Sequence, residues 1–192
     1  MRRKRVAILI SGRGSNMASL IAATRAPDYP AEIVTVISNR DDAAGIAVAR
    51  QAGITAEVVP SKGYADRAAF EAEITRQLEA DRVDIICLAG FMRVLSPEFV
   101  QHWRGRMINI HPSLLPAFPG LNTHERALQA GATEHGCTVH YVSEGVDDGP
   151  IIAQAKVPVL PGDTPESLAV RVLTEEHRLY PAALTTVART TP

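Results

Sequence analysis

Short apolar runs alternate with helix-like segments over the first two-thirds of the chain, and this alternation limits the possible folds most strongly. The run at residues 5–11 has no polar alternation, which is typical of a strand buried on both faces of a parallel sheet. Further strands are expected at residues 32–38, 56–60, 83–88 and 107–111. Helices are expected at residues 17–24, 42–51, 66–80 and 97–103. Alternating units of this kind predict a doubly wound, mostly parallel sheet with helices on both faces.

The last third of the chain changes pattern. Residues 138–142 and 151–159 read as strands with no helix between them, so we expect an antiparallel pair that finishes the sheet. A last helix is predicted at residues 164–180, capped by Asp163 or Thr164 and followed by Pro181. No linker or repeat interrupts the pattern, so residues 1–192 are predicted to form one α/β domain.

Composition limits the class of protein. Apolar residues make up 46% and charged residues 21% of the 192 residues, and the formal net charge is −1. The basic cluster at residues 2–5 is interpreted as a solvated tail, because nucleic-acid footprints are usually broad basic patches. Neither a secretory signal nor a membrane span is expected, since the apolar run that follows is short. Cys87 and Cys137 lie in apolar runs and are predicted to be buried thiols of a cytoplasmic protein.

Two polar side chains stand at the end of one predicted strand. Asn109 and His111 are two residues apart, so they point to the same side, and Pro112 ends the strand. The carboxyl ends of parallel strands open the ligand crevice of an α/β sheet. An amide beside an imidazole suits a reaction in which an oxyanion forms and a proton moves. The alternative is a hydrogen-bonded structural histidine beside an asparagine near a turn.

A carboxylate about thirty-five residues later is the expected third member of this group. Asp147 and Asp148 both lie between the two late strands, and either could favour the cationic form of His111. A plain hairpin turn is the alternative for this segment. His135 and His140 have no partners at metal-ligand spacing, so no metal site is expected.

The loop at residues 11–16 joins the first strand to the first helix. Its glycines and the helix N-terminus suit an anion, which can approach the backbone N–H groups closely. Met17 stands where a dinucleotide fingerprint needs a third small residue, and the end of a P-loop is missing. One phosphate is therefore expected rather than a dinucleotide or a triphosphate, with a simple tight turn as the alternative. Arg13 is either a phosphate partner or a solvent-facing charge.

Two further features remain open on spacing alone. Residues 89–95 follow the fourth strand and could line an apolar slot for a flat heterocycle, or simply pack under the domain. Glu175 and Glu176, late in the last helix, are either solvated charges or a carboxylate that binds hydroxyl groups.

Taken together, several blocks in this order resemble the folate-dependent phosphoribosylglycinamide formyltransferases of purine synthesis. The central blocks are shared by all formyltetrahydrofolate transferases, whereas the glycine loop with the terminal Glu-His pair is more particular to the glycinamide enzymes. The blocks are Ser11–Asn16, Leu88–Pro97, Asn109–Pro116, Thr138–His140, Asp147–Pro150 and Glu176-His177.

The resemblance implies roles for individual residues. It implies that the catalytic trio is Asn109, His111 and Asp147, and so selects Asp147 over Asp148. It also implies that Glu176 binds the hydroxyl groups of the substrate's ribose. The loop from Val142 to Asp147 would close over the pterin, with Asn109 and Asp147 also in contact with the folate. The implied phosphate cradle is Gly12, Arg13, Gly14, Ser15 and Asn16. The implied pterin slot is Met92, Arg93, Val94 and Leu95, with Arg67 near the folate tail.

The implied activity is transfer of a formyl group from 10-formyltetrahydrofolate to 5'-phosphoribosylglycinamide, without a metal, by a cytoplasmic monomer or homodimer. No nucleic-acid or membrane partner is expected. A formyltetrahydrofolate hydrolase and a methionyl-tRNA formyltransferase are the alternative enzymes, but each carries an extra domain that this chain is not expected to have. A non-catalytic folate- or nucleotide-binding module is the alternative of a different class. The chain departs from the family in ending soon after Pro181 and in placing Asp148 where glycine is common.

Overall fold

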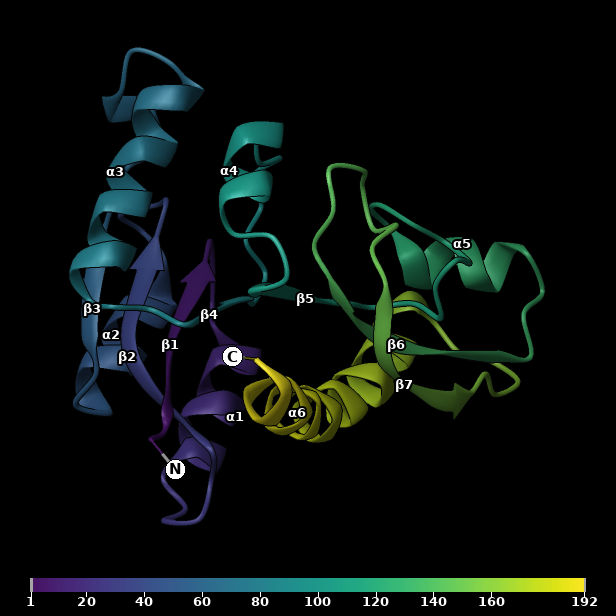
Figure 1. Ribbon diagram of the computed structural model, residues 1–192. Coiled ribbons are helices and arrows are strands. Elements are labelled where there is room, and N and C mark those ends of the chain that lie inside the picture. The colour runs from purple at the N-terminus through teal and green to yellow at the C-terminus, as the bar shows by residue number, and fades with distance from the viewer. Residues whose placement is uncertain (1, 192) are drawn as a thin grey trace.

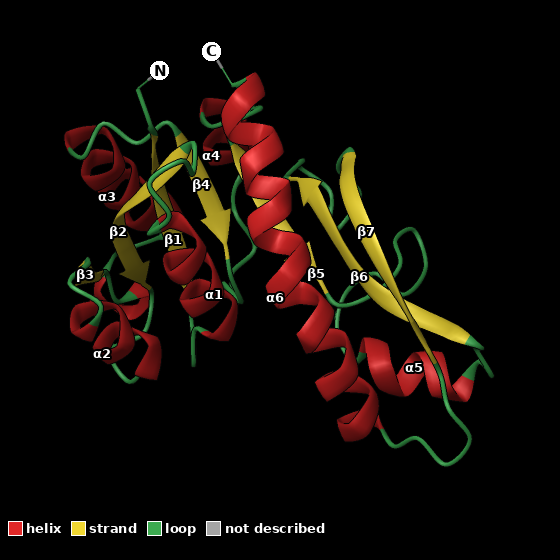
Figure 2. Ribbon diagram, turned by 90° about the horizontal axis from the view of Figure 1, so that it is seen from below, coloured by secondary structure: helices red, strands yellow, loops and turns green. Residues whose placement is uncertain are grey.

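The computed structural model describes residues 2–191, in which one seven-stranded sheet carries helices on both faces (Figures 1 and 2). Its strand order is β3-β2-β1-β4-β5-β6-β7. The strands are β1 (Lys4–Ile10), β2 (Ala31–Ser38), β3 (Thr55–Val58), β4 (Ile85–Leu88), β5 (Met107–His111), β6 (Glu134–Tyr141) and β7 (Ile151–Pro158). The helices are α1 (Ser15–Thr24), α2 (Ala44–Gln51), α3 (Arg67–Ala80), α4 (Pro97–His102), α5 (Thr123–Gln129) and α6 (Pro165–Thr190), with a short 3-10 turn, η1 (Ser61–Gly63).

Strand β1 is buried on both faces, as its unbroken apolar run predicts. Val6, Ile8 and Ile10 pack in one core cluster with side chains of α1, α2 and α6. Ala7 and Leu9 pack in a second cluster with side chains of α3 and α4. The alternation along one strand therefore divides the core into two layers, one on each side of the sheet.

Pairing directions confirm the predicted topology. Strands β1 to β5 pair in parallel, whereas β6 runs antiparallel to both β5 and β7. Strand β1 lies between β2 and β4, so the chain moves to one side of β1 and later returns to the other. The carboxyl ends of β1 and β4 therefore meet at a topological switch point, where α/β sheets open a ligand crevice.

The last helix is longer than its sequence predicts. We expected it to end before Pro181, but α6 continues through Pro181 to Thr190. The segment beyond the proline buries Ala183, Leu184 and Val187 in the first core cluster. Burial of these apolar side chains offsets the backbone hydrogen bond that proline cannot donate. Helix α5 was not predicted, because it buries only Thr123 and Ala127 and so carries little apolar signal.

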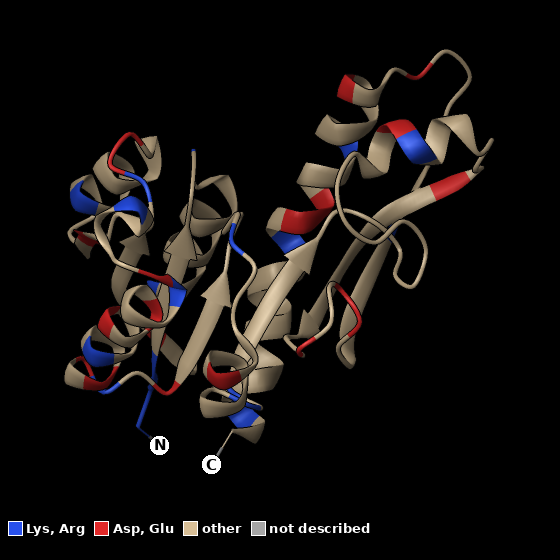
Figure 3. Ribbon diagram, turned by 90° about the horizontal axis from the view of Figure 1, so that it is seen from above, with Lys and Arg blue, Asp and Glu red and all other residues tan. Residues whose placement is uncertain are grey.

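The basic N-terminal segment is tied to the fold, so its interpretation as a solvated tail was wrong. The Arg2 guanidinium forms an ion pair of 2.9 Å with Asp84, and Arg3 Nε donates to the carbonyls of Tyr29 and Ala31, at 3.1 Å each. Elsewhere, Lys and Arg are interspersed with Asp and Glu along the ribbon (Figure 3). Both cysteines are buried free thiols, as predicted. Among residues 2–191, no helix combines the length and apolar character that a membrane crossing requires.

Candidate active site

Strand β5 places Asn109 and His111 side by side, and β6 supplies a partner that the sequence did not identify. His140 is the cross-strand neighbour of Asn109. The amide nitrogen Nδ2 of Asn109 lies 3.3 Å from Nε2 of His140. On its other side, Nδ1 of His140 lies 2.9 Å from the carbonyl oxygen of Tyr141.

These contacts determine the form of His140. A carbonyl only accepts, so Nδ1 of His140 carries the hydrogen and its Nε2 accepts from Asn109. Burial lowers the pKa of His140, which favours the neutral ring. A neutral His140 therefore orients the Asn109 amide group and leaves the second N–H of Nδ2 for another acceptor.

His111 is enclosed by two acceptors. Its Nε2 lies 3.0 Å from the carbonyl oxygen of Phe118, and its Nδ1 lies 3.3 Å from Oδ2 of Asp147. The side chains of His111 and Asp147 are only 7% and 13% exposed, so water screens their attraction weakly. Donating to both acceptors requires a hydrogen on each ring nitrogen. Both ring nitrogens of His111 thus face hydrogen-bond acceptors.

Asp147 reaches this position from the loop between β6 and β7. Its backbone φ is 53°, in the left-handed region that aspartate tolerates better than most residues. The N–H of Gly120 donates to its Oδ2 at 2.9 Å. A single carboxylate oxygen thus joins the loop after β5 to the loop after β6. Asp148 instead accepts from the Ser143 hydroxyl, away from His111.

The loop after β5 is held by buried hydrogen bonds. Thr138 Oγ1 donates to the Ser113 carbonyl at 2.7 Å and accepts from the Leu115 N–H at 3.1 Å. Gln154 Nε2 donates to the Leu115 carbonyl at 2.8 Å. Phe118, whose carbonyl faces His111, has a φ of 52°, which is unusual for a bulky residue. Such strain persists only where the surroundings hold it in place.

The glycine loop forms a hollow of about 270 Å³ at the carboxyl end of β1. Gly14 has a φ of 73° and caps the N-terminus of α1, so the first N–H groups of that helix border the hollow. Arg40, whose role the sequence did not reveal, also lines it and forms a 2.6 Å ion pair with Asp42. The lining residues are Ser11, Gly12, Arg13, Gly14, Ser15, Asn16, Arg40, Ala89, Gly90 and Met92.

Glu176 lies beside this hollow although it is far away in sequence. The Asn16 amide Nδ2 donates to Oε2 of Glu176 at 2.6 Å. Burial raises the pKa of Glu176, and the hydrogen bond from Asn16 opposes that rise. The buried oxygen Oδ1 of Asn16 has no hydrogen-bond partner among the described residues. A buried carboxylate next to an unpaired amide oxygen suits a ligand rich in hydroxyl groups.

The segment predicted as a pterin wall lies between the hollow and helix α3. Met92 and Val94 are each 67% exposed, and Met92 also lines the hollow. Arg93 lies 5.9 Å above the ring of Phe70, whereas Leu95 is partly buried against the second core cluster. Arg67 is the exposed first residue of α3 and lines neither this hollow nor the larger one.

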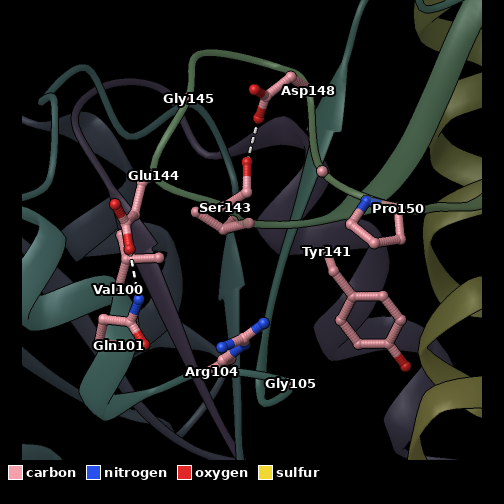
Figure 4. A pocket seen from close by; sticks show the side chains of 12 residues that line it. Val100, Gln101, Arg104, Gly105, Tyr141, Ser143, Glu144, Gly145, Asp148 and Pro150 are labelled. Atoms are coloured by element: carbon pink, nitrogen blue, oxygen red, sulfur yellow. Dashed lines mark hydrogen bonds between the residues drawn. The ribbon is translucent and has the colours of Figure 1, made fainter.

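A larger hollow of about 620 Å³ lies between α4 and the segment that joins β6 to β7 (Figure 4). Of the residues expected to contact folate, Val142 lines it. The Gln101 side chain donates to Glu144 across this hollow, and Ser143 donates to Asp148 within the loop. The contact with Gln101 holds the Val142–Asp147 loop near α4, and the Ser143 contact braces the loop internally. Among residues 2–191, no three His, Cys, Asp or Glu side chains are grouped so that they could hold a metal ion.

Comparisons with known proteins agree with one another. The formyl transferase family model matches residues 4–184. The trifunctional purine biosynthetic protein adenosine-3 of Drosophila melanogaster is 57% identical over 185 residues, which are 95% of this chain and 14% of that protein. The phosphoribosylglycinamide formyltransferase of Escherichia coli strain K12 is 45% identical over 179 residues, which are 93% of this chain and 84% of that enzyme.

Solved structures give the same result. The phosphoribosylglycinamide formyltransferase of Brucella melitensis matches with a TM-score of 0.95 and 57% identity, over 97% of this chain and 96% of that one. The glycinamide ribonucleotide transformylase 1 of Symbiobacterium toebii matches with a TM-score of 0.95 and 46% identity, over 97% of this chain and 88% of that one. The chain thus spans about a seventh of the insect relative but most of the bacterial ones.

Proposed function

This chain belongs to the formyl transferase family, and we propose that it transfers the formyl group of 10-formyltetrahydrofolate to the amine of 5'-phosphoribosylglycinamide. The observation that carries the proposal is the contact of His111 with Asp147, at 3.3 Å, beside Asn109 on the same strand. The bacterial relatives named for this activity are similar along most of the chain. The reaction belongs to purine biosynthesis, which is also named for the insect relative.

The phosphorylated substrate would bind in the hollow at the glycine loop. Backbone N–H groups at the start of α1 suit its phosphate, with Arg13 and Arg40 as nearby cations. The Glu176 carboxylate and Oδ1 of Asn16 would both accept hydrogen bonds from the ribose hydroxyl groups. Gly12, Gly14 and Ser15 complete the cradle.

The folate would lie on the other side of the catalytic trio. Met92, Arg93, Val94 and Leu95 would form one wall of the pterin slot, and the loop from Val142 to Asp147 the other. The exposed apolar side chains of Met92 and Val94 support this placement, because a flat heterocycle gains affinity by covering such groups. Arg67, at the start of α3, would approach the acidic folate tail.

The reaction begins when the substrate amine attacks the formyl carbon and forms a new C–N bond. The formyl oxygen becomes an oxyanion, to which Asn109 donates through the N–H that His140 leaves free. Cationic His111 stabilises the same oxygen, and Asp147 keeps His111 charged. The attacking nitrogen loses a proton, N10 of the folate gains one, and the bond from carbon to N10 then breaks. Asp147 would order a water molecule that carries this proton.

The domain organisation, the cellular location and the oligomeric state are part of the same proposal. Residues 1–192 would act as one formyltransferase domain in the cytoplasm, as a monomer or a homodimer, on small-molecule substrates. The chemistry needs no metal, because Asn109 and His111 supply the charge stabilisation that a Lewis acid would otherwise give.

This proposal can be tested by measuring folate deformylation through the change in absorbance. The purified chain should leave the formyl folate intact when it is the sole substrate, and should turn it over when phosphoribosylglycinamide is added. Turnover without the acceptor would indicate a formyltetrahydrofolate hydrolase. The absence of turnover under both conditions, with ligand binding retained, would indicate a non-catalytic binding module.

A further inference from the structure

We propose that Ser11 is a positioning residue that holds the folate-binding segment in register with the phosphate cradle. This inference rests on the proposed function and adds a residue to it. Ser11 follows β1 at the topological switch point and is 7% exposed. It lines the glycine-loop hollow next to Met92, which belongs to the segment proposed to bind the folate.

The Ser11 hydroxyl joins the ends of three strands. It donates to Oδ1 of Asn39, which follows β2, at 2.5 Å. It accepts from the backbone N–H of Met92, which follows β4, at 2.8 Å. The backbone N–H of Ser11 also donates to the Gly90 carbonyl at 3.1 Å. The segment Gly90–Met92 is thus attached to the first residue of the glycine loop at two points.

The glycine loop has other hydrogen bonds that hold it in place, whereas the Met92 N–H depends on Ser11. The glycine loop is also held by α2, because the Gly45 N–H donates to the Gly12 carbonyl at 3.0 Å. It continues directly into α1, where Ala18 N–H donates to the Gly14 carbonyl at 2.9 Å. For the Met92 N–H, Ser11 supplies the acceptor. Removing the hydroxyl should therefore displace the folate side more than the phosphate side.

Asn39 gives the hydroxyl its direction. A serine hydroxyl has one hydrogen to donate, and Asn39 Oδ1 takes it. The lone pairs of Ser11 Oγ then remain for the Met92 N–H. Because Asn39 is 7% exposed, water competes weakly for this arrangement. The hydrogen bond to Met92 is thus oriented as well as close.

Ser11→Ala tests the proposal when the Kd for folate and the KM values for the formyl donor and for phosphoribosylglycinamide are measured separately. We expect the tetrahydrofolate Kd and the KM for the formyl donor to rise roughly tenfold, since the partly buried N–H of Met92 loses its partner. The KM for phosphoribosylglycinamide should change less than about twofold, because the cradle keeps its own supports. Ser19→Ala is the matched control: it also removes a serine hydroxyl near the loop, one that donates to the Asn16 carbonyl at 2.8 Å.

The outcomes separate the two proposals. The role of Ser11 would be overturned if Ser11→Ala and Ser19→Ala had the same folate Kd and the same KM values. It would also be overturned if Ser11→Ala raised the KM for phosphoribosylglycinamide as much as the KM for the formyl donor. Folate binding without formyl transfer by the unaltered chain would overturn the proposed function alone, and an absence of folate binding would overturn both. If Ser11→Ala does not fold, Ser11→Cys replaces it, because its thiol is a weaker acceptor of similar size; a raised folate Kd is again expected.

Discussion

The imidazole of His111 meets an acceptor at each ring nitrogen, so neither nitrogen is free for a ligand in this arrangement. Asp147 and the Phe118 carbonyl together occupy both ring nitrogens of His111. One of them must release His111 before it can contact a substrate oxygen. We expect Phe118 to yield, because its backbone is strained at a φ of 52°. Asp147 would remain in contact with Nδ1 of His111.

Loss of either oxyanion donor should abolish most turnover without unfolding the chain. Removing one such donor typically costs about 3–4 kcal/mol in the barrier. Asn109→Ala and His111→Ala should therefore lower kcat by a factor of about 100 to 1000, measured in the acceptor-dependent assay. His102→Ala is the control, since this histidine is exposed and pairs with Glu79 at 3.0 Å. Near-normal turnover in both purified variants would refute the assigned roles.

At the scale of elements, helix α2 supports the glycine loop, the proposed phosphate cradle, through a close approach at Gly45. An added Cβ there would lie 2.5 Å from Cδ1 of Ile10 and 3.1 Å from the Gly12 carbonyl. The Ile10 side chain can adjust, whereas the Gly12 oxygen belongs to the backbone of the glycine loop itself. The position of the glycine loop therefore depends on the absence of a side chain at Gly45, in the first turn of α2.

Gly45→Ala should push the glycine loop away from α2. We expect the unfolding free energy to fall by about 1–3 kcal/mol, as is typical of overpacking. The KM for the phosphorylated substrate should rise, because its cradle has moved. Gly63→Ala is the control, since its added Cβ would meet Pro60 at an ordinary 3.6 Å. A normal substrate KM in Gly45→Ala, determined from initial rates, would contradict this account of the cradle.

Helix α5 and strand β6 meet at a pair of histidines that should make stability depend on pH. His124 Nδ1 lies 3.1 Å from His135 Nε2. Burial, followed by the charges of His124 and His111, lowers the pKa of His135 to about 4. The unfolded chain binds this proton at a higher pH, near the ordinary histidine value of about 6.5. The contribution of His135 to stability is therefore full above that value and is lost as the pH falls toward 4.

Denaturant unfolding at a series of pH values measures this effect. The unfolding free energy should decrease by roughly 1–3 kcal/mol between about pH 6.5 and pH 4 through this group. His135→Gln keeps a polar side chain but cannot titrate, so its stability should vary less over the same range. The same slope in both proteins would exclude His135 as the source.

At the scale of the whole molecule, the alternation of apolar runs was enough to predict the sheet and its mixed strand directions. It could not predict α5, because an amphipathic pattern needs more than two buried positions. The predicted end of α6 was wrong because the prediction considered only the local effect of Pro181. It did not include the burial of the next two turns in the core. Tertiary burial outweighs a local preference in that segment.

The candidate site was predictable in part. The spacing of Asn109 and His111 placed them on one face, and the contact of His111 with Asp147 was expected from the resemblance. The supporting contacts were not predicted, because they cross between distant segments. His140 beside Asn109 and Ser11 beside Met92 depend on strand register, which no local pattern specifies.

The C-terminal turns of α6 should be essential to the fold as a whole. Leu184 is fully buried in the first core cluster, beyond the proline. Leu184→Ala should lower the unfolding free energy by about 2–5 kcal/mol, measured by denaturant titration. Thr186→Ala, at an exposed position of the same helix, should leave it nearly unchanged. Equal stabilities for the two variants would mean that the helix beyond Pro181 does not pack as described.

Tracing the formyl carbon tests the proposed function most directly. The purified chain would receive 10-formyltetrahydrofolate labelled with ¹³C in its formyl group, together with phosphoribosylglycinamide, and the products would be analysed by mass spectrometry. The account predicts that the label appears on the amine of the ribonucleotide, and that His111→Ala largely abolishes this transfer. Labelled formate as the main product, or an unlabelled ribonucleotide, would contradict it.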